Sequence, residues 1–176
     1  GNNVISAVFE DKTNKLWIGL QNGGGVFLFN RETKKNKNYL KGSTIFCFTE
    51  DNSGVLWLGG PGGLFRYNRD EDNFIRYNDP GMMSGIPNVS SIVEDNQHCV
   101  WVSSSIGLLR INQQRNQTSK FGKGYGVNAT NWYWHEGFTT RKWELCFGSA
   151  TGYYLVNPDE IAKNLKSPEI GFSGFR

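Results

Sequence analysis

The chain has 176 residues, a formal net charge of +3 and a mean hydropathy of −0.50, so it is neither strongly basic nor membrane-like in composition. Aromatic residues account for 14% of the chain and there are 22 glycines, which is typical of a β-sheet protein with many tight turns. No apolar run is long enough to span a bilayer, so we expect no direct membrane insertion by this segment. The nearly balanced charge also predicts no nucleic-acid partner.

The first predicted strand, at residues 4–9, is short and rich in β-branched and aromatic residues, with turn formers on both sides. A Glu-Asp pair follows it, and a tryptophan stands six residues after the aspartate. This motif recurs as Glu10-Asp11 with Trp17, Glu50-Asp51 with Trp57, and Glu94-Asp95 with Trp101. The tryptophans are 40 and then 44 residues apart (17 to 57, 57 to 101). A period of this length indicates one supersecondary unit that is copied and stacked.

The second copy has the clearest strands, which we expect at 44–49, 55–59, 63–68 and 74–78. The segments between them are rich in glycine, proline, aspartate and asparagine, which favour tight turns. Each copy is therefore predicted to be a four-stranded antiparallel meander. The first strands of the unit are apolar on both faces, as in 45–48, which fits a blade packed between two neighbours.

The sequence thus predicts an all-β fold, a β-propeller fragment of about four blades. We expect blades at 1–42, 43–87 and 88–130, a degenerate last blade at 131–161, and a linker with the first strand of a following domain at 162–176. The repeated aspartates and tryptophans are predicted to be structural, with the indoles buried between blades. They are Asp11, Trp17, Asp51, Trp57, Asp95 and Trp101. The chain opens directly into a strand, so we expect a piece of a longer protein.

The repeated pattern, Glu-Asp followed by an aliphatic residue, Trp, an aliphatic residue and Gly, closely resembles the two-component regulator propeller repeat. The first and second copies carry the pattern nearly in full, at 10–30 and 50–68. The third copy departs from it, with His98-Cys99 in the turn and Ser103-Ser104 in place of glycine. The tail, at 147–170, is similar to that family's last blade running into its immunoglobulin-like triple-tyrosine domain.

In that family the propeller is the extracytoplasmic sensor of a hybrid two-component histidine kinase. The resemblance therefore implies a periplasmic location, as the ectodomain of an inner-membrane receptor in a Gram-negative bacterium. It also implies an oligosaccharide ligand, a role in regulating polysaccharide utilisation, and neither catalysis nor a cofactor in this segment.

Two other functions stay open. Residues 51–57 look somewhat like the Asp-box hairpin of sialidase propellers, which would make the chain a glycoside-active enzyme. Such an enzyme needs carboxylates at the ring axis. The expected inner strands instead begin with Val4, Thr44, Val89 and, in the degenerate copy, Trp134 or a residue near it. A protein-interaction scaffold is the third function, since propellers present loops to proteins as readily as to sugars.

The loop that leads into the last blade departs most from the repeat, and variable loops carry the binding residues of such folds. It combines aromatic rings with amide and imidazole groups, which suit the apolar face and the hydroxyl rim of a sugar. The candidate ligand-binding residues are Tyr125, Asn131, Trp132, Tyr133, Trp134 and His135. The alternative is that Trp132 and Trp134 are core residues of the last blade.

No grouping typical of nucleophilic catalysis or of a metal site is visible in the sequence. The three cysteines fall in or beside predicted strands and are expected to be isolated buried thiols. They are Cys47, Cys99 and Cys146. An arc of four blades would expose apolar faces at both ends, so we expect it to dimerise or to join the remaining blades of a larger ectodomain.

Overall fold

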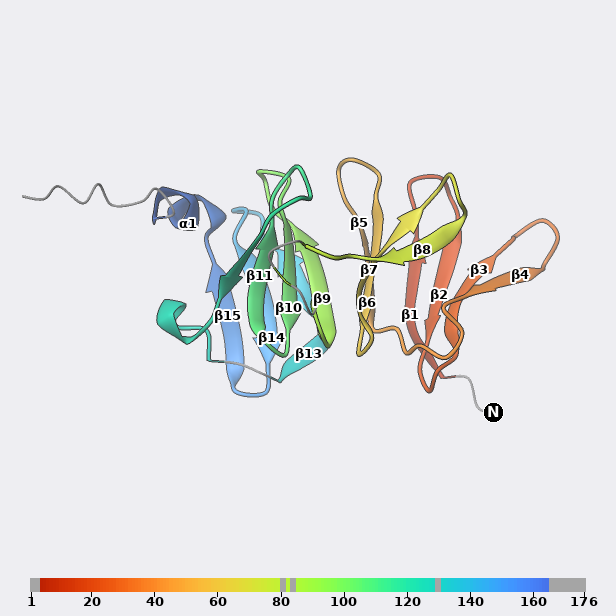
Figure 1. The fold of residues 1–176 in the computed structure, drawn as a ribbon, viewed down its shortest axis with the longest axis horizontal. Helices are drawn as coiled ribbons and strands as arrows, with labels where there is room; N and C mark the ends of the chain where they lie inside the picture. Colours follow the sequence, from red (N-terminus) through yellow and green to blue (C-terminus); the bar gives the residue numbers. More distant parts are fainter. Residues whose placement is uncertain (1–3, 80–81, 83–84, 129–130, 165–176) are drawn as a thin grey trace, which may run out of the picture.

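The computed structural model describes residues 4–79, 82, 85–128 and 131–164, which form four antiparallel sheets of strands consecutive in the chain (Figure 1). Blade 1 contains β1 (Ile5–Glu10), β2 (Leu16–Leu20), β3 (Gly25–Phe29) and β4 (Asn36–Tyr39). Blade 2 contains β5 (Cys47–Glu50), β6 (Leu56–Gly60), β7 (Gly63–Asn68) and β8 (Asn73–Arg76). Blade 3 contains β9 (Val89–Glu94), β10 (Val100–Ser104), β11 (Gly107–Ile111) and β12 (Thr118–Phe121). Blade 4 contains β13 (Trp132–Thr139), β14 (Leu145–Ser149) and β15 (Gly152–Val156).

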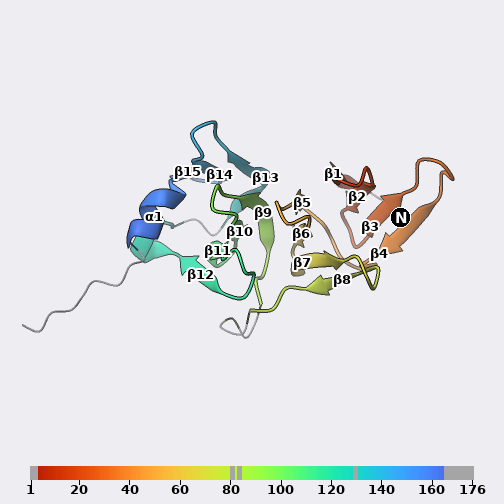
Figure 2. The same ribbon diagram turned by 90° about the horizontal axis from the view of Figure 1, so that it is seen from above.

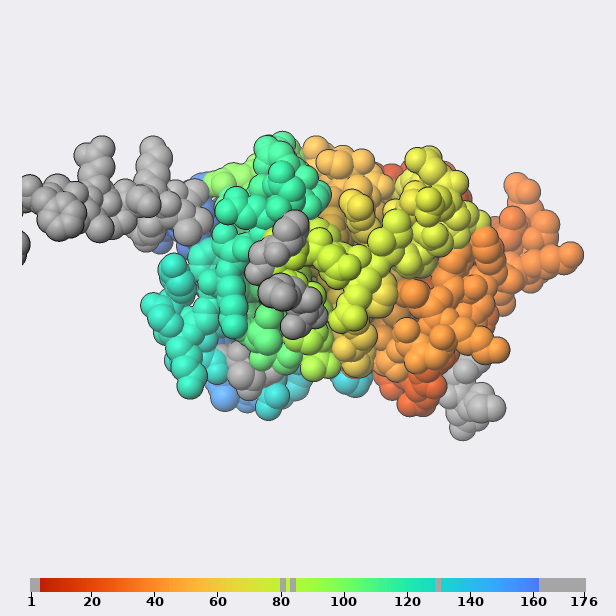
Figure 3. All heavy atoms as spheres, viewed as in Figure 1, coloured from red at the N-terminus to blue at the C-terminus, as the bar shows by residue number. Residues whose placement is uncertain are grey.

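The blades lie side by side in a fan, as Figure 2 shows from above, which confirms the predicted all-β propeller arrangement of four blades. The first strand of each blade is its inner strand, and β9 packs against both β5 and β13. The later strands of each blade point outward. The β3–β4 hairpin projects furthest, and it forms the orange protrusion in Figure 3.

The prediction of four strands per blade is wrong for blade 4, which has three strands in the described part of the chain. An α-helix, α1 (Pro158–Asn164), follows β15 and was not expected from the sequence. The Asn157 side chain caps it by accepting a hydrogen bond from the Asp159 amide at 3.1 Å. Pro158 at the first helical position and two acidic residues in the first turn favour the helix. Residues 165–176, where the linker and following strand were predicted, lie outside the described residues.

The repeated Asp and Trp form one hydrogen-bonded unit in each of the first three blades. The indole nitrogen donates to a carboxylate oxygen of the aspartate six residues earlier, at 3.0 Å in blade 1, 2.9 Å in blade 2 and 2.7 Å in blade 3. The other carboxylate oxygen accepts a main-chain N–H of the turn between the first two strands. Trp17, Trp57 and Trp101 are all fully buried, as predicted. This unit fixes the turn and seats the indole between blades.

Blade 4 builds the same turn without the aspartate or the tryptophan. Thr140 stands where the aspartate would be, and its hydroxyl accepts the main-chain N–H of Glu144 at 3.1 Å. Cys146 stands at the tryptophan position, one residue into β14. The Thr140 hydroxyl thus replaces the carboxylate as acceptor for the main-chain N–H of the turn. Blade 4 has no indole ring at the position of the repeated tryptophan, because Cys146 stands there.

Neighbouring blades are joined by charged groups at the ends of these turns. The Glu94 carboxylate of blade 3 accepts the main-chain N–H of Asn52 in blade 2 at 2.8 Å. The guanidinium of Arg115, also from blade 3, contacts the buried Asp51 carboxylate of blade 2 at 2.8 Å. Arg69 of blade 2 lies 3.5 Å from Asp11 of blade 1 in the equivalent way. The aspartate of one blade thus faces an arginine from the next.

An aromatic cluster fills the space between blades 1 and 2, where Trp17 contacts Tyr39, Tyr67 and Phe74 with ring centroids 4.9–5.7 Å apart. Both tyrosine hydroxyls donate to the Asp72 carboxylate, which also pairs with Lys37. Burial and the hydrogen bond to Asp72 raise the pKa of Tyr67 to about 12. The Lys37 ammonium and the two hydroxyls lower the pKa of Asp72 below its usual value.

We expect Asp72→Asn to lower the free energy of unfolding at pH 7 by about 1 kcal/mol, because the carboxylate is half exposed and partly screened. A carboxylate with a lowered pKa stabilises the fold above the pKa of the unfolded chain, and that contribution is lost as the pH falls through the folded pKa. Urea titrations from pH 7 to pH 2 should therefore show the gap between wild type and variant closing in acid. Asparagine also tolerates the positive φ of 50° at this position. A gap that stays constant with pH would contradict this assignment.

Both ends of the fan expose apolar side chains. On blade 1, Ile5 is 59% exposed and Val8 is 60% exposed. On blade 4, Phe138, Tyr153 and Leu155 are between 53% and 74% exposed. Equivalent faces of the middle blades are buried against neighbours. Among the described residues, no helix is long and apolar enough to cross a bilayer.

Candidate functional site

The inner strand of blade 4 carries a wide bulge. In β13, Trp132 pairs with Ser149 of β14, and the next pair is Gly137 with Phe147. Four residues of β13, 133–136, therefore lie opposite the single residue Gly148. Bulges of this kind turn side chains out of the sheet and are common at binding sites. The candidate site is this segment, which we call the inner-rim bulge.

The inner-rim bulge reaches across to the inner strands of the first two blades. The ring of Trp134 stacks on Phe46, which lies just before β5, with centroids 4.0 Å apart and 14° between the planes. The imidazole Nε2 of His135 lies 3.0 Å from the main-chain oxygen of Ser6 in β1. His135 has a positive φ of 61°, so its backbone is held in a conformation that non-glycine residues seldom adopt. The conformation of the bulge is therefore fixed by specific contacts with blades 1 and 2.

The bulge nevertheless leaves much of its aromatic surface open. Trp134 is 49% exposed and Tyr133 is 56% exposed, while His135 and Glu136 are also exposed. One face of the Trp134 indole is covered by Phe46, and the remainder of the ring is available to solvent. Asn131, directly before β13, is also exposed. The arrangement offers one partly open indole, one phenol ring and amide and imidazole groups within one short segment.

Trp132 has a different environment from its two aromatic neighbours. It is 6% exposed, and its indole nitrogen donates to the main-chain oxygen of Ser104 at 2.7 Å. Its ring packs between Phe147 and Tyr154, with centroids 6.3 Å and 5.2 Å away. The Trp132 ring is thus part of the core between blades 3 and 4.

Tyr125 lies away from the bulge, in the short 3-10 helix η1 (Lys123–Tyr125) that follows β12. It is 63% exposed, and its ring contacts Phe121 edge-on at 5.0 Å. It lines a pocket between blade 3, blade 4 and α1. The structure therefore brings Tyr133, Trp134 and His135 together but places Tyr125 elsewhere.

Phe46 and Ser6 belong to the site and were not singled out from the sequence. Both stand in segments that match the ordinary inner-strand pattern, so no local signal separates them from core residues. Their role depends on a contact made by a segment far along the chain. Only the folded arrangement of three blades identifies them.

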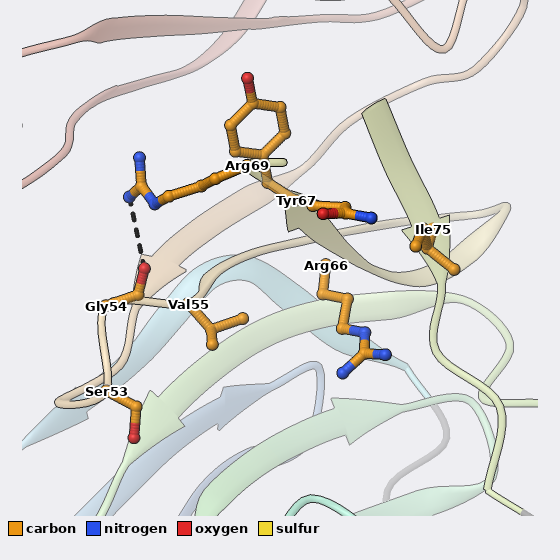
Figure 4. Close-up of a pocket in the computed structure, with 8 residues that line it drawn as sticks. Ser53, Gly54, Val55, Arg66, Tyr67, Arg69 and Ile75 are labelled. Carbon is orange, nitrogen blue, oxygen red and sulfur yellow. Dashed lines mark hydrogen bonds between the residues drawn. The ribbon is translucent and has the colours of Figure 1, made fainter. Parts of the chain in front are cut away.

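A second hollow lies beside the turns of blade 2 and is drawn in Figure 4. It has a volume of about 370 Å³, and the Arg69 guanidinium donates to the Gly54 main-chain oxygen at its edge. Arg69 is also paired with Glu50 at 3.1 Å. A hollow of about 440 Å³ occupies the same place in blade 1, lined by residues 13–15 and 28–32. Because it recurs with the repeat and its arginine is already paired, we attribute it to blade geometry.

The described residues contain no group of three or more His, Cys, Asp or Glu side chains that could hold a metal ion. Cys47 and Cys99 are buried and Cys146 is half-buried, and all three are free thiols. Burial raises the pKa of the Cys47 and Cys99 thiols, which keeps them protonated and unreactive.

Comparison with known proteins identifies the repeat. Residues 39–62 match the family described as two component regulator propeller, so the chain carries this repeat. No curated protein sequence matches the chain.

The fold is similar to those of several solved structures. Two are extracellular domains assigned to hybrid two component systems of B. thetaiotaomicron, at TM-scores of 0.75 and 0.69 and sequence identities of 19% and 22%. The matches cover 93% and 89% of this chain and 23% of each of those chains. A virginiamycin B lyase from Staphylococcus aureus is also similar, with a TM-score of 0.59, 16% identity, and coverage of 82% of this chain and 48% of the lyase. The chain thus spans less than a quarter of the length of the two extracellular domains that it resembles.

Proposed function

We propose that this chain is part of the periplasmic sensor region of a hybrid two-component histidine kinase and that it takes part in recognising an oligosaccharide without catalysing a reaction. The repeat at 39–62 and the similarity to extracellular domains of hybrid two component systems support the sensor assignment. The apolar faces left open on blades 1 and 4 support a larger ectodomain that contains further blades.

The inner-rim bulge supports the proposed ligand class. The C–H face of a sugar ring packs well on an aromatic ring, and sugar hydroxyls pair with amide and imidazole groups. Trp134 supplies the half-open indole, Tyr133 a second ring, and His135 with Asn131 the polar groups. The partly covered Trp134 is held in place by Phe46, so little side-chain entropy remains to be lost on binding.

The contacts of the bulge also suggest how binding is coupled to the rest of the ectodomain. The Trp134–Phe46 stack and the His135–Ser6 contact join the last blade to the first two. A ligand that binds one conformation of the bulge more tightly than another increases the fraction of molecules in that conformation, and with it the fraction in which these inter-blade contacts are formed or broken.

Trp134→Ala in the complete ectodomain is expected to weaken oligosaccharide binding at least tenfold, because one stacking surface is removed. Titration calorimetry against a panel cut from arabinan, xylan, mannan and chondroitin sulfate measures the change. The matched control is Trp143→Ala, since Trp143 is 56% exposed but lies in the turn at the other end of the same strand pair. Equal affinities for wild type and both variants would reject the bulge as the binding surface.

The catalytic alternative makes a separate prediction. The inner strands begin with Ile5, Cys47, Val89 and Trp132, and none of these supplies a carboxylate to the axis. Incubation of the same panel with the ectodomain, followed by chromatography of the sugars, should return each oligosaccharide unchanged. Release of shorter products would favour the glycoside-active enzyme instead. Binding of a protein and of no sugar in the panel would favour the scaffold.

A further inference from the structure

A hollow on blade 3 lies between the β10–β11 turn and the segment that leads out of β12. It has a volume of about 280 Å³. Residues 105–107 of the turn line it on one side, and residues of the segment 120–128 line it on the other. The buried side chain of Val127 contributes apolar surface. Two short segments, separated in the chain by the β11–β12 hairpin, therefore form the walls.

The loop after β12 takes a different path from the loop after β4 in blade 1. In blade 1 that loop packs directly on the β2–β3 turn, where the Gly42 amide donates to the Gly23 oxygen at 2.8 Å. In blade 3 the chain turns into η1 instead, and the Gly122 oxygen accepts the amides of Tyr125 and Val127 at 2.9 Å and 3.1 Å. These two bonds hold the loop in one conformation, so the walls of the hollow are fixed before any ligand arrives.

Two lysine ammonium groups at this hollow have no partner in the part of the chain that the structure describes. Lys120 of β12 and Lys123 of η1 both line the hollow, and both side chains are exposed. Neither ammonium group makes an ion pair or a hydrogen bond with another described residue. Arg31 of blade 1 is also exposed, but its guanidinium is paired with Glu10 at 2.7 Å. Two unpaired cations beside one hollow attract anions to it.

Ser105 and Asn128 add neutral hydrogen-bonding groups to the same hollow. The Ser105 hydroxyl oxygen accepts the side-chain amide of Asn88 at 3.4 Å, so its own proton is free to donate. The side-chain amide of Asn128 bonds to no other residue within the described ranges. The two ammonium groups, the hydroxyl and the amide can all donate hydrogen bonds. The ligand that matches this set is an anionic oxygen group, because it accepts several hydrogen bonds and balances the charge.

We propose that this hollow binds an anionic oxygen group, a sulfate ester or a carboxylate, carried by an acidic oligosaccharide. This ligand class rests on the proposed function and narrows it to sugars with sulfate esters or uronic acids. The Trp132 indole donates to the main-chain oxygen of Ser104, the residue before Ser105, at 2.7 Å. The hollow therefore lies beside the start of β13, the strand that carries the inner-rim bulge, and one oligosaccharide can contact both.

Calorimetry of the complete ectodomain with four matched tetrasaccharides tests the proposal. Chondroitin sulfate carries both anionic groups, unsulfated chondroitin carries only carboxylates, and carboxyl-reduced chondroitin sulfate carries only sulfate esters. Carboxyl-reduced unsulfated chondroitin is the neutral control. We expect at least one acidic form to bind about tenfold more tightly than the neutral form, because charge-assisted hydrogen bonds are the stronger ones. The form that loses this preference identifies which anionic group the hollow takes.

The double variant Lys120→Gln/Lys123→Gln should bind the acidic and neutral forms equally, whereas Lys120→Arg/Lys123→Arg, which keeps the charges, should retain the preference. Lys142→Gln is the matched control, since Lys142 is an exposed lysine in the turn at the other end of blade 4. Equal affinities of the wild type for acidic and neutral forms would overturn the proposal. A preference that survives in the glutamine double variant would overturn it as well.

Lysine acetylation followed by mass spectrometry separates this proposal from the proposed function, because it needs no sugar. Sodium sulfate, compared with sodium chloride at equal ionic strength, should slow acetylation of Lys120 and Lys123 and leave Lys142 unchanged. If no oligosaccharide binds but sulfate protects the two lysines, the proposed function fails and the anion site stands. If an oligosaccharide binds and neither it nor sulfate protects them, the proposed function stands and the anion site is overturned.

Discussion

Replacing Asp51 with alanine is expected to lower the free energy of unfolding by about 3–5 kcal/mol. The Asp51 carboxylate is fully buried and accepts hydrogen bonds from the Trp57 indole, the Val55 amide and the Arg115 guanidinium. Arg115 is itself only 10% exposed. Removal of the carboxylate therefore leaves the buried Trp57 indole N–H and the Val55 amide without their acceptor and takes away the nearer of the two carboxylates that face Arg115, the other being Glu94 at 3.7 Å. The summed cost exceeds the net value of any single hydrogen bond.

Urea unfolding followed by circular dichroism measures this effect. Asp70→Ala is the matched control, because Asp70 is an exposed aspartate of the same blade and should change stability by less than about 0.5 kcal/mol. A double-mutant cycle with Arg115→Ala should show coupling, since the Asp51 carboxylate and the Arg115 guanidinium are in direct contact at 2.8 Å. If Asp51→Ala were as stable as Asp70→Ala, the inter-blade role of this carboxylate would be wrong.

Gly59→Ala is expected to lower the free energy of unfolding by about 3 kcal/mol, because β6 of blade 2 packs tightly against β9, the inner strand of blade 3, at this glycine. A Cβ atom at Gly59 would lie 2.2 Å from Val89 Cγ1, 2.8 Å from Val89 Cβ and 2.9 Å from Cys47 Sγ. Val89 is fully buried, so it has no free space into which to move. The methyl group must therefore push β9 away from blade 2 and loosen the packing around Cys47.

Thermal and urea unfolding of Gly59→Ala should be compared with those of Gly124→Ala. A Cβ atom at Gly124 would meet nothing within 4 Å, so that variant should be neutral. Gly148→Ala is an informative intermediate, since the three heavy atoms nearest to its Cβ would all belong to Glu136 of the exposed bulge. A Gly59 variant as stable as the Gly124 variant would mean that blades 2 and 3 are packed less tightly than described.

The parts of the fold that follow from local sequence were predicted well. The third strand of blade 2 spans Gly63–Asn68, as expected, because glycines and the Asn-Arg-Asp turn delimit it on both sides. The recurring aspartate and tryptophan predicted a buried structural unit, since a fixed offset of six residues requires the same geometry in each copy. Because the repeat is written in residues close together in the sequence, it predicts local structure without knowledge of how the blades pack.

The features that depend on contacts between distant segments could not be predicted. The α1 helix was missed for a different reason: Asn157 and Pro158 form a helix start, which is a local signal, but it lies outside the repeated pattern. The inter-blade position of Arg115 depends on the packing of two blades and leaves no periodic trace. The stacking of Trp134 on Phe46 likewise requires a bulge in β13 whose width no sequence pattern records.

Hydrogen exchange of the complete ectodomain, with and without the tightest-binding oligosaccharide of the panel, tests the proposed binding surface most directly. We expect slower exchange at residues 131–136 and around Phe46, with no change in the turns that hold Asp11 and Asp51. Protection confined to those turns or to the hollow drawn in Figure 4, with the inner-rim bulge unaffected, would contradict the account.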